Sequence, residues 1–105
     1  MTDATTALLR ALRSHMNTAQ VMNFVSENIV SRTWTSATFS GVRHVVAFRL
    51  EGLGAETAAD AFLSNLADAE FALRGLILAD IALLSREDRE GVVRIAVEAL
   101  TIEDG

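Results

Sequence analysis

The segment "ILADIALLSREDREGVVRIAVEAL", residues 77–100, decides the fold, because it reads either as a β-hairpin or as a helix that runs into a strand. Leucine and alanine favour a helix over residues 73–84, which would continue the preceding helix. Gly75 interrupts that run, however, and folding the segment about Asp88 produces one face without any charge. This face contains Ile77, Ala79, Ile81, Leu83, Val93, Ile95, Val97 and Ala99. We therefore predict a hairpin, with "SREDREG" at residues 85–91 as its charged loop.

The N-terminal part of the chain has the spacing of an amphipathic helix. Its apolar residues recur at intervals of three, four or seven positions, which places them on one stripe. They are Leu8, Leu12, Met16, Ala19, Met22 and Ile29. We predict a helical segment over residues 3 to about 32. Asn17 and Gln20 have the spacing of a capping box, so this segment is either one long helix or a short helix followed by a longer one.

The next stretch, "TWTSATFSGVRHVVAFRLEG" at residues 33–52, is rich in β-branched and aromatic residues. It predicts two strands joined by a two-residue turn at Ser40-Gly41, with Phe39 opposite Val42. His44 then shares one face with the apolar residues of its strand, and we expect this face to be the core face. Trp34, Arg43 and Arg49 lie on the other face.

Residues 51–70, "EGLGAETAADAFLSNLADAE", predict a glycine turn followed by a second helix. Thr57 is the expected N-cap, Asp60 lies in the first turn, and Ala59, Phe62, Leu63 and Leu66 form the apolar stripe. We expect this helix to end near Glu70. Gly52-Leu53-Gly54 precedes it but lacks the third glycine of a dinucleotide fingerprint, so we predict no cofactor site here.

These elements together predict a single α+β domain over residues 1–105, because 105 residues support one modest core. The expected architecture is a two-layer αββαββ sandwich in which two helices cover one face of a four-stranded antiparallel sheet. The natural topology for this order is a permuted ferredoxin-like arrangement. If residues 76–84 are helical, an αββαβ order remains.

The face of the sheet away from the helices is too apolar to be left fully exposed to solvent. Such a face is covered by another copy, a partner protein, a ligand, or the N-terminal residues 3–15 folded over it. We predict a homodimer joined through this face, with a further protein partner as a possibility. The expected interface residues are Trp34, Arg43, Arg49, Leu78, Leu84, Arg94 and Leu100.

An apolar outer face without a recognisable catalytic motif favours a non-enzymatic binding or assembly module. The alternative is a small-molecule-binding protein or enzyme built like a dimeric α+β barrel, with a pocket between two sheets and His44 or Arg94 near its mouth. His44 is the candidate general base in that case. No cysteine is present, and no second histidine or carboxylate stands at ligand spacing, so we predict neither a metal site nor a cofactor.

Charge and hydropathy narrow the partner classes. The formal net charge of −5 would repel a phosphate backbone, and the nine arginines are scattered along the chain, so we predict no nucleic acid partner. Half of the residues are apolar, but no stretch reaches 18 consecutive apolar residues, and the first ten residues do not resemble a leader. We therefore expect no membrane association and a cytoplasmic location.

Overall fold

The computed structural model describes residues 4–15, 23–64, 66 and 76–103. Within them the chain forms six elements in the order αββαββ. These are α1 (Ala4–His15), β1 (Asn23–Thr35), β2 (Ser40–Glu51), α2 (Ala55–Ser64), β3 (Leu76–Arg89) and β4 (Val92–Glu103). The α+β class and the order of the elements agree with the prediction.

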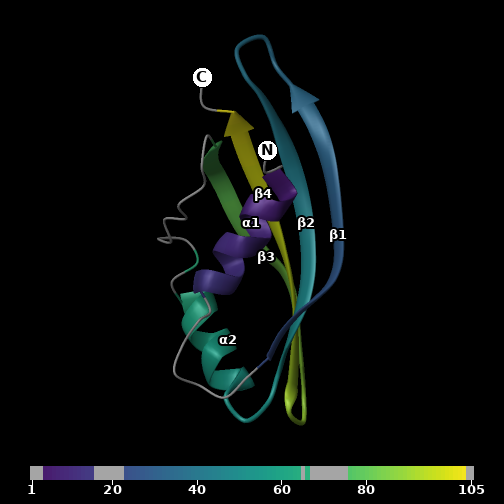
Figure 1. The fold of residues 1–105 in the computed structure, drawn as a ribbon, viewed down its shortest axis with the longest axis vertical. Coiled ribbons are helices and arrows are strands. Elements are labelled where there is room, and N and C mark those ends of the chain that lie inside the picture. Colours follow the sequence, from purple (N-terminus) through teal and green to yellow (C-terminus); the bar gives the residue numbers. More distant parts are fainter. Residues whose placement is uncertain (1–3, 16–22, 65, 67–75, 104–105) are drawn as a thin grey trace.

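The four strands form one antiparallel sheet in the order β1-β2-β4-β3, and both helices pack on the same face of it (Figure 1). The two hairpins therefore meet through their C-terminal strands, and β1 and β3 are the edges. A permuted ferredoxin-like arrangement remains a prediction.

The core lies between the helices and the two central strands. Along β2 and β4 the side chains alternate between buried and partly exposed, as a half-buried sheet requires. Leu8 and Leu12 stand one turn apart on α1, and Ala55, Ala58, Ala59 and Phe62 line the buried face of α2. Phe48 stacks against Phe24, with ring centroids 4.8 Å apart, and meets the edge of Phe62 at 5.9 Å.

The second hairpin, on which the fold depends, is present: β3 and β4 pair as antiparallel strands. The predicted loop is wrong, because residues 85–89 belong to β3 and the turn lies at Glu90 and Gly91. Gly91 has a φ of +74°, a left-handed conformation that glycine adopts without steric cost. The pairing places the charged residues on an edge strand instead of in a loop.

The predicted faces of β3 are only partly right, because two β-bulges interrupt its pairing with β4. The register shifts between Leu78 and Asp80 and again between Leu83 and Ser85. Each bulge inserts one residue and reverses which residues face the helices. Ile77, expected in the core, lies opposite Ile102 and is 50% exposed, whereas Leu78 packs against the core.

The first hairpin forms, but its turn is not at Ser40-Gly41. Ser40 and Gly41 belong to β2, and Val42 pairs with Thr33 instead of Phe39, a shift of six residues along the partner strand. Because six is an even number, the shift preserves the predicted faces. His44 is fully buried on the helix side, as expected, and Trp34, Arg43 and Arg49 lie on the opposite side.

The prediction of helix over residues 3–32 is right for α1 and wrong for residues 23–32, whereas residues 16–22 lie outside the described residues. The described part of the helix is Ala4–His15, and residues 23–35 form β1. The capping box at Asn17 and Gln20 lies outside the described residues. The segment "NFVSENIVSRTWT" contains five β-branched residues, and it pairs with β2 from Asn23 to Thr35 with one bulge, which satisfies the backbone groups that face β2.

The second helix begins earlier than predicted. It starts at Ala55 instead of after Thr57, and the backbone N–H of Ala58 donates to the carbonyl oxygen of Gly54 at 2.9 Å. Its expected end near Glu70 lies outside the described residues.

Candidate functional site

The face of the sheet away from the helices, called the outer face here, is the principal candidate surface. The register across the four strands defines its members. They are Val25, Asn28, Val30, Arg32 and Trp34 on β1; Arg43, Val45, Ala47, Arg49 and Glu51 on β2; Ile77, Asp80, Ala82, Ser85, Glu87 and Arg89 on β3; and Val92, Arg94, Ala96, Glu98, Leu100 and Ile102 on β4.

Apolar side chains run across the middle of the outer face. Val30 pairs with Val45, and Ala47 pairs with Ala96 on the neighbouring strand. At one end of the sheet, Ile102 lies between Gly41 and Ile77. Helix α1 does not cover this face, because Leu8 and Leu12 are buried in the core on the other side. The alternative in which residues 3–15 fold over the outer face is therefore wrong for the described part of α1.

Four of the five arginines of the outer face, Arg43, Arg49, Arg89 and Arg94, contact carboxylates of the same face or its bulge, and Arg32 forms no ion pair with a described residue. Arg43 contacts Glu98 at 2.9 Å. Arg49 and Arg94 lie directly opposite each other on β2 and β4, and without a carboxylate nearby their two positive charges would repel each other. Glu27, at the bulge of β1, lies between them and accepts contacts of 3.3 Å from Arg49 and 3.4 Å from Arg94.

A second carboxylate, Glu51, contacts Arg49 at 3.3 Å. Its hydrogen bond is the main reason that the pKa of the Arg49 guanidinium is raised above its ordinary value. Arg49 therefore remains a cation that its own sheet neutralises. The bulge in β1 has a function in this arrangement, because it brings the Glu27 carboxylate to a pair of arginines that would otherwise repel each other.

The outer face is electrically neutral although the protein is not. Five arginines and five carboxylates lie on it or at its bulges, whereas the whole chain carries a formal net charge of −5. They are Arg32, Arg43, Arg49, Arg89, Arg94, Glu27, Glu51, Asp80, Glu87 and Glu98. The acidic excess therefore lies elsewhere on the molecule.

Five of the seven predicted interface residues come together on the outer face, namely Trp34, Arg43, Arg49, Arg94 and Leu100. Leu84 lies at the second bulge of β3 and is 51% exposed. Leu78 does not belong to this set, because the first bulge turns it toward the core. The indole Nε1 of Trp34 is buried without a hydrogen-bond partner in the described structure, beside Gly41, where a Cβ would lie 3.1 Å from it.

His44, the candidate general base, is buried in a chain of hydroxyl groups on the helix side of the sheet. Its Nδ1 lies 2.9 Å from the Ser31 hydroxyl and its Nε2 lies 3.0 Å from the Thr101 hydroxyl. Because the Thr101 hydroxyl donates its proton to the carbonyl oxygen of Val42, it accepts the hydrogen bond from His44 Nε2. These contacts join β1, β2 and β4 and explain the buried histidine structurally.

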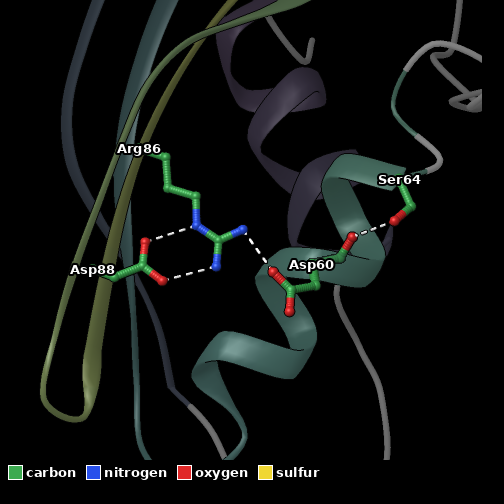
Figure 2. A network of polar contacts seen from close by, with 4 residues as sticks. All are labelled: Asp60, Ser64, Arg86 and Asp88. Atoms are coloured by element: carbon green, nitrogen blue, oxygen red, sulfur yellow. Dashed lines mark hydrogen bonds and ion pairs between the residues drawn. The ribbon is translucent and has the colours of Figure 1, made fainter.

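A second polar cluster, which was not predicted from the sequence, anchors α2 to β3 (Figure 2). The guanidinium of Arg86 binds both carboxylate oxygens of Asp88, at 2.7 and 2.8 Å, and contacts Asp60 of α2 at 2.7 Å. Arg86 lowers the pKa of Asp88 through these hydrogen bonds. The contact between Arg86 and α2 could not be predicted while "SREDREG" was taken as a loop. Arg86 points toward the helix because it lies on β3, where side chains alternate between the two faces.

No group of three or more metal-ligating side chains occurs among the described residues. Over the same residues, no helix is both long and apolar enough to cross a membrane. The predicted cytoplasmic location stays a prediction.

Comparison with known proteins identifies no family to which the chain belongs. No protein-family model and no curated protein matches it. A chain of the solved structure "Virion of native gene transfer agent (GTA) particle" is similar in fold, with a TM-score of 0.63 and 14% sequence identity over 100% of both chains. At this identity the likeness shows a shared fold.

Proposed function

We propose that this protein is a small non-enzymatic assembly component that forms a homodimer through its outer face. The observation that carries the proposal is the combination of apolar side chains with arginines of which four of five are already paired on the same face. Burying an unpaired charge costs several kcal/mol, whereas a paired charge costs far less. A second copy can cover this face without supplying a counterion for each arginine.

Neutrality supports a second copy as the occupant. Two identical surfaces that carried the average charge of this acidic protein would repel each other, but two copies of a neutral face do not. A twofold axis also lets the arginines of one copy approach the carboxylates of the other. The structural neighbour is a chain from a virion particle, and an assembly role for the present chain is compatible with that origin.

Sedimentation equilibrium tests the proposal. The wild-type protein should be a dimer at micromolar concentration. Ala47→Glu should weaken the dimer by about a hundredfold or more, because a twofold axis brings two unpaired carboxylates into the interface. Ala61→Glu, the same change on the exposed surface of α2, serves as the matched control and should leave the dimer intact.

A wild-type protein that remains a monomer at roughly 100 μM would overturn the proposal. Equal dissociation constants for the two variants would also contradict it, because the outer face would then not be the interface. A dimer that encloses a cavity of several hundred cubic ångströms between its sheets would favour the small-molecule-binding alternative.

A further inference from the structure

The part of the first hairpin between Glu27 and Glu51 is basic in an acidic protein. Between Asn28 and Leu50 the chain contains three arginines and no carboxylate, although the whole sequence has 14 acidic residues against nine arginines. Two of these arginines, Arg32 and Arg43, lie directly opposite each other near the end of the hairpin. Like charges in this position destabilise a strand pair, so this pair of arginines does not contribute to the stability of the monomer. We therefore ask whether they bind another molecule.

The two arginines differ in their ion pairs. Arg43 contacts Glu98 and its side chain is still 53% exposed. Arg32 is exposed and forms no ion pair with any residue that the structure describes. Arg32 is therefore a cation on a positively charged hairpin that is available to a carboxylate of another molecule.

The turn that closes this hairpin displays an aromatic ring. Phe39 is 55% exposed. Two hydrogen bonds close the turn: the Ser36 N–H donates to the Phe39 carbonyl at 2.7 Å, and the Phe39 N–H donates to the Ser36 hydroxyl at 3.0 Å. We call residues 32–43 the hairpin tip. It lies at one end of the 46 Å long axis of the molecule (Figure 1).

The opposite end of the molecule has complementary chemistry. The β2–α2 turn and the β3–β4 turn lie side by side there, joined by a 3.0 Å hydrogen bond from the Gly52 N–H to the Gly91 carbonyl (Figure 1). Leu53 on the first turn is 99% exposed. Glu56 and Glu90 flank these turns, are exposed, and form no ion pair within the described structure. We call Leu53, Glu56 and Glu90 the turn end.

We propose that copies of this chain associate head to tail, with the hairpin tip of one copy docked on the turn end of the next. Arg32 would pair with Glu56 or Glu90, and Phe39 would cover the apolar surface of Leu53. Neither end can bind itself, because one is basic and the other acidic, so the contact joins unlike surfaces and can continue from copy to copy. Arg32 belongs to the edge of the outer face, but Phe39, Leu53, Glu56 and Glu90 lie outside it, so this contact goes beyond the proposed dimer.

Complementary variants test the contact, each made together with Ala47→Glu so that the outer face cannot contribute. The tip variant carries Arg32→Glu and Phe39→Ser, and the turn-end variant carries Glu56→Arg and Glu90→Arg. The parent carries only Ala47→Glu. All substituted tip and turn-end positions are exposed, and circular dichroism with thermal melting verifies that each variant folds. If one does not fold, Arg32→Gln and Glu90→Gln replace the double changes.

Sedimentation velocity at low salt should show concentration-dependent association of the parent and a monomer for each variant alone. An equimolar mixture of the two variants should form a 1:1 complex, because one supplies an intact turn end and the other an intact tip. Raising the ionic strength tenfold should weaken this complex by about tenfold or more. Arg32→Lys, which keeps the charge, should leave the parent's association within a few-fold.

A monomeric parent, or a mixture in which both variants remain monomers, would overturn the head-to-tail contact. These outcomes are separate from the fate of the proposed dimer, because the dimer is judged from the effect of Ala47→Glu on the otherwise wild-type chain. A protein that dimerises through the outer face but whose variants do not combine would lose only the head-to-tail contact. The reverse result would leave the head-to-tail contact standing without the dimer.

Discussion

Gly41 is the position at which the smallest change should have the largest specific effect. It lies on β2, between Trp34 of β1 and Ile102 of β4. A Cβ added there would overlap the carbonyl oxygen of Thr101 and lie 3.1 Å from the indole Nε1 of Trp34. The first of these atoms belongs to the backbone of a central strand and cannot rotate away. Gly41→Ala should therefore force β2 and β4 apart locally.

The magnitude follows from two opposing effects. Overpacking a fully packed site costs about 1–3 kcal/mol, and a clash with a backbone atom belongs near the upper end of that range. Replacing glycine by alanine restricts the unfolded chain and returns about 0.4–1 kcal/mol. The net loss should be about 2 kcal/mol. For a domain of this size, a loss of that order lowers the melting temperature by about 10 °C.

Thermal and urea unfolding monitored by circular dichroism measure this loss, and Gly91→Ala is the matched control. Gly91 has open space around it but a positive φ, so alanine there should cost only about 1 kcal/mol through backbone strain. Gly91→Asn should recover part of that cost, whereas Gly41→Asn should not. A Gly41→Ala protein with the wild-type melting temperature would refute the steric argument.

Three further substitutions test the polar contacts. Thr101→Val removes the acceptor of His44 and should cost about 1–3 kcal/mol in urea unfolding, since both groups are buried; a wild-type midpoint would contradict this assignment. The pKa of Asp88 is lower in the folded protein than in the unfolded chain, where it is about 4. The pairing with Arg86 therefore stabilises the fold fully above about pH 4, and this stabilisation is lost as the pH falls through the lowered pKa of the folded state. Arg86→Met should therefore lose stability at pH 7 and show a flatter acid limb, and an unchanged limb would exclude the pair as its cause. Glu27→Gln should change monomer stability by less than about 1 kcal/mol but weaken the dimer measurably by sedimentation, because it leaves two outer-face arginines without their shared carboxylate.

The central strands were the most predictable part of the fold. No register shift interrupts the pairing between β2 and β4, so the alternation read from the sequence gives the correct face for each residue of both strands. His44, Arg43 and Arg94 are therefore on the predicted sides. The turn of the first hairpin was predicted at the wrong place, but the faces of its strands were still correct, because the pairing is shifted by an even number of residues.

The edge strands were less predictable because their structure depends on partners far away in the sequence. Leu12 and Ile29 fit one helical stripe, but pairing with β2 makes Ile29 part of a strand. The alternation of apolar and polar residues in a sequence also does not reveal where a bulge lies. One inserted residue between Leu78 and Asp80 is enough to place Leu78 against the core instead of in the expected interface. Arg86 was missed for a related reason, since its carboxylate on α2 is 26 residues away.

The same bulges bear on how the protein can assemble. An unprotected edge strand recruits strands from other molecules, and bulges and charged side chains are the usual protection. Here β1 has a bulge at Glu27, and β3 has two bulges and a charged run that ends at Arg89. The pairing of β2 with β4 has no shift, and these two strands form the regular centre of an outer face that is neutral as a whole. Growth of the sheet edge to edge is thus disfavoured, whereas association through the outer face or through the two ends of the molecule is left open.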